Sequence, residues 1–137
     1  MGLYLCVFDG DDELEGVEIG NYSDFSYFRS RLTELLENGV TGSRFPTLTL
    51  HSDSDGEWSV GECEALRTEL LIIAHEFQQF PGIKFGSEWQ QQVGKALGLT
   101  PLTLYDSFID VDGEPLLARL IQLCDLALER TMPILFQ

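Results

Sequence analysis

The residues best suited to chemistry lie between His51 and Glu62, where acidic side chains recur with the spacing of a calcium-binding loop. The run is His51-x-Asp53-x-Asp55-Gly56-x-Trp58-x-x-x-Glu62. With His51 counted as the first position, its residues match a calcium-binding loop at the third, fifth, sixth, eighth and twelfth positions. Carboxylate oxygens at these positions are the ligands that calcium prefers. The run therefore indicates a candidate metal site, which has to be weighed against a purely structural turn.

The first position of that loop argues against calcium, because His51 supplies a nitrogen where the ion needs a hard oxygen ligand. A strand-to-helix turn explains the same residues, with Gly56 at a positive φ and with Ser59 and Glu62 forming a capping box on the next helix. We therefore expect no metal and no cofactor. A calcium-dependent regulator, or a small enzyme that uses the His51 to Glu62 loop, is kept as the alternative.

The remaining reactive residues supply no pair of nucleophile and base. His75 lies in a predicted helix, and no Ser or Cys is placed by its spacing to be activated by that ring. The cysteines Cys6, Cys63 and Cys124 are odd in number, far apart and surrounded by apolar residues, which is typical of buried core thiols. We expect no catalytic residues, and a protein that is not an enzyme.

Charge restricts the class of partner. The 137 residues contain 8 Lys and Arg against 23 Asp and Glu, giving a formal net charge of -15. Such a chain repels nucleic acid and anionic lipid, because both are normally bound through a basic surface. The acids serve either solubility alone or the recognition of a basic protein.

The start of the chain carries no basic segment followed by a long apolar stretch, so we expect no secretory signal. No run of about 18 apolar residues could span a bilayer. We therefore expect a cytoplasmic protein that contacts neither membrane nor nucleic acid.

The elements follow from apolar periodicity and from turn signals. Strands are predicted over 3–8, 14–19, 45–50, 102–109 and 133–136, with acidic turns at 9–12, 51–56 and 110–113. Helices are predicted over 25–35 with a cap at Ser23, over 63–80 behind Ser59, over 89–97 behind Ser87, and over 117–128 with Pro115 at its first position.

This order fits a single domain over residues 1–137, because no long linker or internal repeat divides it. The helices are amphipathic, so each has one face to bury against a sheet. We predict an α+β fold, with a single mixed sheet of about five short strands packed by four helices.

Two acidic turns are the predicted partner-binding surface, because loops at strand ends carry function on a fixed scaffold. Aromatic side chains add to the argument: Trp89 lies on an apolar helix face and is expected in the core, whereas Trp58 beside Glu57 is a candidate interface anchor. The predicted binding residues are Asp11, Asp12, Glu13, Glu15, Asp53, Asp55, Glu57 and Trp58.

The chain carries, from its first residue to its last, the blocks MGLYLCVFD, DDELEGVEIG with NYSDF, HSDSDGEW, IDVDGEPL and the terminal PILFQ. In these blocks it resembles the immunity protein 70 family of bacterial polymorphic toxin systems. The resemblance implies a cytoplasmic antidote that binds a cognate toxin protein, and it supplies no functional residues to carry across.

An acidic domain without catalytic residues also suits a toxin whose active-site cleft is basic, as in nucleases. A scaffold subunit that forms a homodimer by adding its edge strand to a second copy is the other alternative. The mass of the protein in solution separates that alternative from the others.

Overall fold

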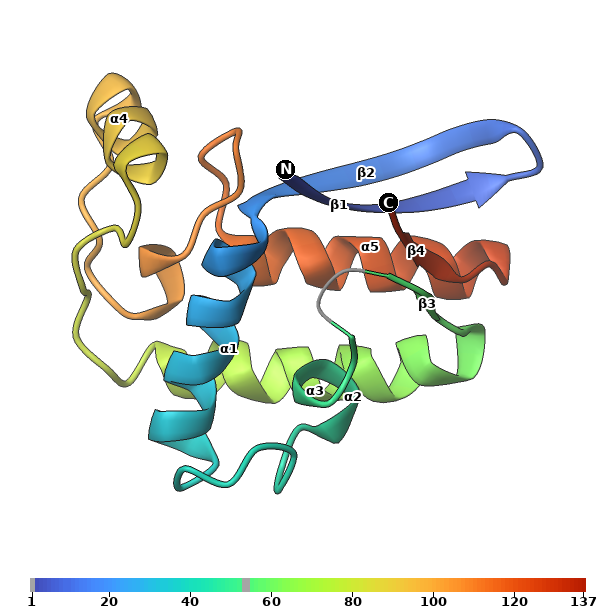
Figure 1. Ribbon diagram of the computed structural model, residues 1–137, viewed down its shortest axis with the longest axis horizontal. Helices are drawn as coiled ribbons and strands as arrows, with labels where there is room; N and C mark the ends of the chain where they lie inside the picture. The colour runs from blue at the N-terminus through green and yellow to red at the C-terminus, as the bar shows by residue number, and fades with distance from the viewer. Residues whose placement is uncertain (1, 53–54) are drawn as a thin grey trace.

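The computed structural model describes residues 2–52 and 55–137 (Figure 1). In this part of the chain the elements follow one another as β1 (Gly2–Asp9), β2 (Asp12–Asn21), α1 (Tyr22–Leu36), α2 (Pro46–Thr49), β3 (Glu57–Trp58), α3 (Val60–Phe77), α4 (Glu88–Leu97), the 3-10 turn η1 (Tyr105–Ser107), α5 (Leu116–Arg130) and β4 (Ile134–Phe136).

The described residues form one antiparallel sheet with the strand order β2-β1-β4-β3. The predicted α+β fold is confirmed, but the sheet has four strands and is antiparallel throughout, where a mixed sheet of about five was expected. Five α-helices accompany it, because the short α2 adds to the four predicted. The strand pair β1–β2 is the longest and forms a hairpin across the predicted acidic turn at 9–12.

Helices cover one side of the sheet. Figure 1 shows α5 running along one face of the sheet, with α3 on the far side of α5 and α1 crossing beside them. The core between these elements is apolar and contains Leu5, Val17, Phe28, Leu70 and Leu120, all nearly or fully buried. No helix of the described residues lies over the other face of the sheet, so that face is open.

Two predicted strands are wrong. The segment 45–50 forms α2, because Pro46 suits the start of a helix and the carboxylate of Glu69 accepts hydrogen bonds from the backbone N–H groups of Thr47 and Leu48, at 3.2 and 3.1 Å. The segment 102–109 is a loop containing η1, in which the Asp106 side chain accepts hydrogen bonds from residues 102 and 103.

The predicted helices are confirmed with shifted ends. Ser59 and Glu62 form the expected capping box at α3, and Gly98 closes α4 in the left-handed conformation with φ of 70°. The cap of α1 is Asn21 rather than Ser23, because Asp24 reaches back to the Asn21 N–H at 2.8 Å. Pro115 is the N-cap of α5 and not its first helical residue.

Candidate partner-binding surface

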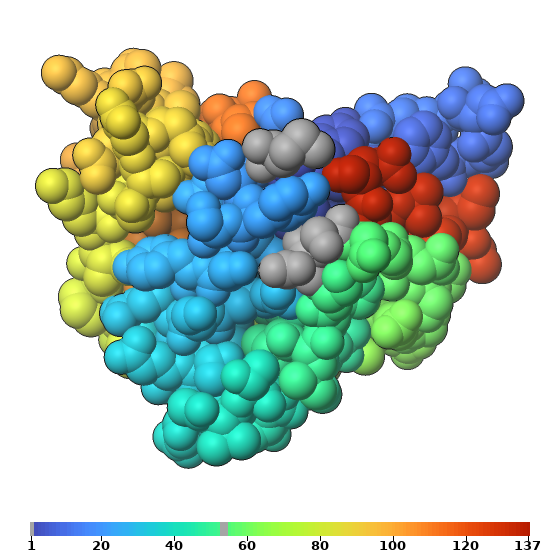
Figure 2. All heavy atoms as spheres, in the orientation of Figure 1, coloured from blue at the N-terminus to red at the C-terminus, as the bar shows by residue number. Residues whose placement is uncertain are grey.

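The β1–β2 hairpin presents exposed acids at its tip. Asp9 pairs with Asp12 at the end of the ladder, and Gly10 adopts a φ of 64° that closes the turn. Asp11, Asp12 and Glu13 are exposed, and within the described residues no Lys or Arg forms an ion pair with them. Figure 2 shows the hairpin projecting from one corner of the molecule. The tip therefore carries unneutralised negative charge into solvent.

Glu15 differs from these three acids, because it lies on the side of the sheet that faces α5. It pairs with Val7, a core residue, and its carboxylate is 3.6 Å from Nη2 of Arg119. The same carboxylate accepts a hydrogen bond from the Gly16 N–H at 3.0 Å. Part of the charge of Glu15 is thus neutralised within the protein.

The second predicted acidic segment is the turn before α3. Asp53 lies outside the described residues. Asp55 is exposed and accepts a hydrogen bond from the Ser52 hydroxyl at 2.7 Å, and Glu57 is exposed on the edge strand β3. The turn therefore presents at least two acids to solvent.

The expectation that Trp58 is an exposed anchor is wrong, because its side chain is 0% exposed. Its indole N–H donates to the carbonyl of Thr47 at 2.9 Å, and its ring packs against Phe136 and His51 with centroids 4.8 and 5.0 Å apart. Trp58 belongs to β3, whose alternation points Glu57 outward and Trp58 into the core. The acidic residues beside Trp58 in the sequence indicate a turn, so the strand β3 was not predicted.

The described ends of the candidate calcium loop are engaged with the protein itself. The ring nitrogens Nδ1 and Nε2 of His51 each lie 2.8 Å from a backbone carbonyl, those of Ser52 and Glu57. Glu62 accepts a hydrogen bond from the Ser59 N–H at 3.0 Å. These contacts are what the turn and capping-box interpretation requires.

The open face of the sheet carries a small apolar centre. Leu3, Leu5 and Val7 point into the core, so alternation places Tyr4, Cys6 and Phe8 on the open face, together with Leu135 of β4. Tyr4, Phe8 and Leu135 are partly exposed, whereas Cys6 is fully buried. Two aromatic rings and a leucine therefore line this face.

Tyr4 lies across Gly16 on the neighbouring strand, where any side chain would overlap the phenol ring. Burial raises the pKa of Tyr4 to about 12, and a hydrogen bond to Glu13 and the charge of that residue act in the same direction. The phenol thus stays protonated and is held flat against the sheet.

Acids border this apolar centre at both edges of the sheet. Glu13 and Glu18 face outward from β2, opposite Phe8 and Tyr4, and Glu57 lies opposite Leu135 on β3. The structure thus brings Glu13 and Glu57, from the two predicted segments, to the same open face. Sequence reasoning missed Tyr4, Phe8, Glu18 and Leu135, although the alternation of β1 could have revealed the first two.

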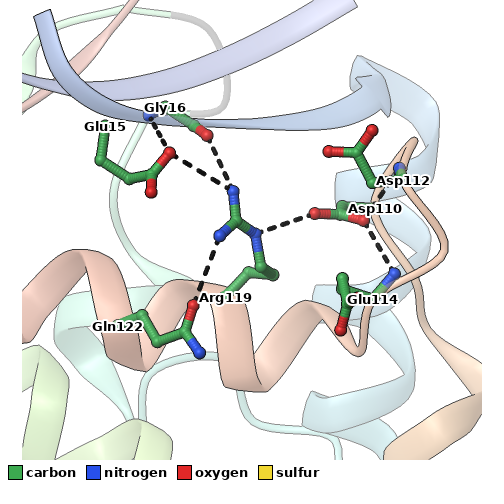
Figure 3. Close-up of polar contacts among 7 residues, drawn as sticks. All are labelled: Glu15, Gly16, Asp110, Asp112, Glu114, Arg119 and Gln122. Carbon is green, nitrogen blue, oxygen red and sulfur yellow. Dashed lines mark hydrogen bonds and ion pairs between the residues drawn. The ribbon is translucent and has the colours of Figure 1, made fainter.

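Arg119 of α5 links the outer strand β2 to the loop before α5 (Figure 3). Its Nη2 donates to the carbonyl of Gly16 at 3.0 Å and its Nε donates to Asp110 at 3.1 Å. Asp110 also accepts hydrogen bonds from the N–H groups of Asp112 and Glu114, both at 3.0 Å, which shapes the 110–114 loop. The acidic DVDGE segment is therefore a turn built around a single arginine.

The free edge of β2 is partly occupied as a result. The Gly16 carbonyl is used by Arg119, and the Glu18 carbonyl accepts a hydrogen bond from the Val111 N–H at 3.1 Å. A second copy adding a strand at this edge would need the same carbonyls. The homodimer alternative therefore has to use another surface or displace these contacts.

The cysteine thiols are shielded from solvent. All three cysteines are buried and unpaired, as expected of core thiols, and burial raises the pKa of Cys6 and of Cys63 to about 11. Within residues 2–52 and 55–137, no three His, Cys, Asp or Glu side chains gather to form a metal site. Over the same residues, no helix is long and apolar enough to cross a membrane.

Comparison with known proteins names the family. The family model described as immunity protein 70 matches residues 3–136, which is nearly the whole chain, so the chain belongs to the immunity protein 70 family. No curated protein and no solved structure matches the sequence. The resemblance seen in the sequence blocks is confirmed, and the membership indicates an immunity protein rather than an enzyme.

Proposed function

We propose that this chain is a cytoplasmic immunity protein, which binds a cognate bacterial toxin and neutralises it through its acidic surface. Its membership of the immunity protein 70 family supports a role in immunity. The observation that carries the rest is the set of exposed acids Asp11, Asp12 and Glu13, which form no ion pair within the described residues and lie on a projecting hairpin. Asp55 and Glu57 are proposed to extend this surface beside the other edge of the sheet, and Asp53, which lies outside the described residues, stays a predicted member of it.

Neutralisation then requires no chemistry by this chain. A toxin that cuts or modifies nucleic acid has to present a basic cleft to the phosphate backbone. An acidic hairpin that reaches into such a cleft competes with the substrate for the same cations, and opposite charge accelerates the encounter. The toxin would be held in a stoichiometric complex with its active site covered.

The open sheet face would supply the contact area beside the hairpin. Interfaces combine an apolar, often aromatic centre with a polar rim. Tyr4, Phe8 and Leu135 provide such a centre, and Glu13 and Glu57 lie on its rim. We therefore expect rim acids to govern the association rate and the apolar centre to govern dissociation.

Co-expression tests this proposal. The toxin domain encoded by the reading frame beside this gene is induced in bacteria with or without this chain, and growth is recorded. We expect the wild-type chain to restore growth and to co-purify with the toxin domain. A chain with Asp12 and Glu13 both changed to Lys should protect poorly.

The matched control changes Glu64 and Glu129, which are exposed on α3 and α5, to Lys, and it should protect like the wild type. Failure of the wild-type chain to bind the toxin domain or to restore growth would overturn the proposal.

A further inference from the structure

A groove lies between α4 and the sheet, next to the open face. Its walls are Trp89 and Val93 of α4, Glu18 and Gly20 of β2, and Val111 of the loop that Arg119 holds in place. The groove has a volume of about 440 Å³.

The tryptophan in this groove is rigidly held. Its indole N–H donates to the carboxylate of Asp24 at 2.8 Å, and the same oxygen caps α1 through the Asn21 N–H. Gly20 lies directly against the ring, since a side chain there would overlap it. Trp89 nevertheless stays partly exposed, so the ring is fixed in orientation while part of it is open to a ligand.

Glu18 gives the groove its charge. The backbone of Glu18 is fixed, because its carbonyl accepts the Val111 N–H at 3.1 Å, while its side chain is exposed. Within the described residues neither Lys nor Arg lines the groove, and no ion pair is formed by the Glu18 carboxylate. An aromatic ring and a free carboxylate thus border the same apolar hollow.

We propose that this groove takes one arginine side chain from the protein partner. The guanidinium would stack on the Trp89 ring while donating to the Glu18 carboxylate, and its aliphatic stem would pack against Val93 and Val111. Arginine suits the site better than lysine, because its planar head can stack and form hydrogen bonds at the same time. This inference rests on the proposed function, in that the partner is a toxin with a basic surface.

The first test needs no toxin. The chain has two tryptophans, so a nitrogen-15 NMR spectrum contains two indole N–H signals, and N-acetyl-arginine amide is titrated as the probe. We expect the Trp89 signal to shift in a saturable manner. The Trp58 signal should stay in place, because that indole is buried and bonded to Thr47.

The controls for this titration test whether the response depends on the charge of the probe and on the charge of Glu18. N-acetyl-citrulline amide has nearly the same shape without the charge and should leave the Trp89 signal unmoved, and Glu18→Gln should abolish the response to the arginine probe. Glu18 is exposed, so this variant should fold normally. No saturable shift with the arginine probe, or equal shifts with both probes, would overturn the proposed site.

The second test measures binding of the toxin domain from the neighbouring reading frame. Glu18→Gln and Trp89→Leu should each weaken the complex by about tenfold, the size of a partly desolvated cation–π or ion-pair contact. Trp89→Phe, which keeps an aromatic ring, should lose less, and the control Glu64→Gln should bind like the wild type.

The two tests separate the two proposals. If the wild-type chain fails to bind the toxin domain, the proposed function is wrong. The proposal that the groove binds an arginine of that toxin is then wrong as well, even if the arginine probe shifts the Trp89 signal. If the wild type binds and neither Glu18→Gln nor Trp89→Leu weakens the complex, the function stands and the inference about the groove is wrong.

Discussion

Arg119 and Asp110 form an ion pair, with Nε 3.1 Å from the Asp110 carboxylate, between side chains that are 18% and 1% exposed. The pair joins α5 to the loop that borders the groove, and the same arginine holds the β2 backbone at Gly16. Arg119 therefore contacts both the outer strand of the sheet and the loop that forms one wall of the groove.

Arg119→Ala should strongly destabilise the protein. The change leaves the buried Asp110 carboxylate without its cation, and the loss of one partner of a buried pair costs about 3 kcal/mol of the free energy of unfolding. Denaturant unfolding measures this cost. The control is Arg67→Ala, whose partner Asp125 is 51% exposed and whose loss should cost less than about 1 kcal/mol. Equal costs for the two variants would contradict the role given to Arg119.

Glu37 should make stability depend on pH. Burial alone would raise the pKa of this carboxyl, but hydrogen bonds from the Phe45 N–H, the Thr33 hydroxyl and the Arg44 N–H outweigh burial and lower it. A lowered pKa stabilises the fold above the unfolded-state pKa, and this contribution is lost as pH falls through the lower folded-state value.

Glu37→Gln should therefore cost about 2 kcal/mol at neutral pH, since the N–H groups of Arg44 and Phe45 lose their charged acceptor. The difference from the wild type should shrink on acidification to below the folded-state pKa. Unfolding curves recorded at several pH values provide the measurement. A cost that stayed constant down to strongly acidic pH would show that the ionised carboxylate is not responsible.

The thiols should react slowly in the native protein. Cys6, Cys63 and Cys124 are buried, and burial raises the pKa of each of them, so little thiolate forms at neutral pH. Labelling with a thiol reagent should be slow for the native chain and fast after unfolding in denaturant. Rapid labelling of any one of the three without denaturant would show that this cysteine is not buried in the core.

Metal removal should leave the melting temperature unchanged. The ring nitrogens of His51 already face backbone carbonyls, and Glu62 is occupied in the capping box of α3. Melting curves with and without a chelator make the comparison. A fall of several degrees that calcium restores would establish Asp53, Asp55 and Glu62 as ligands.

The sequence predicts those elements whose signals are local. The capping box at Ser59 and Glu62 marks the start of α3 through contacts three residues apart, and it is confirmed. Gly98 ends α4 in an equally local way, next to the predicted helix end at residue 97. The hairpin is equally local, because its turn and both strands are adjacent in the chain.

The errors arise where distant residues decide the structure. Segment 45–50 alternates like a strand, but Glu69 caps it as a helix from 21 or 22 residues away. Trp58 is drawn into the core by the pairing of β3 with β4, the last strand of the chain. The groove is lined by α4 and β2, which are separated by about half of the sequence. The residue pattern within either element does not predict it.

The acidic surface itself is tested by association kinetics. A chain with Asp12, Glu13, Asp55 and Glu57 all changed to Lys is compared with the wild type in binding the toxin domain from the neighbouring reading frame. The pair of changes Asp12→Lys and Glu13→Lys is matched in net charge by Glu64→Lys and Glu129→Lys on the helices. Association and dissociation rate constants are recorded for every chain at several salt concentrations.

We expect the four-residue variant to associate at least about tenfold more slowly at low salt, because opposite charge steers the encounter. Salt should slow association of the wild type far more than it speeds dissociation, and the helix control should keep nearly wild-type rates. Unchanged rate constants in the four-residue variant would contradict the account and place the interface on the helices or on β4.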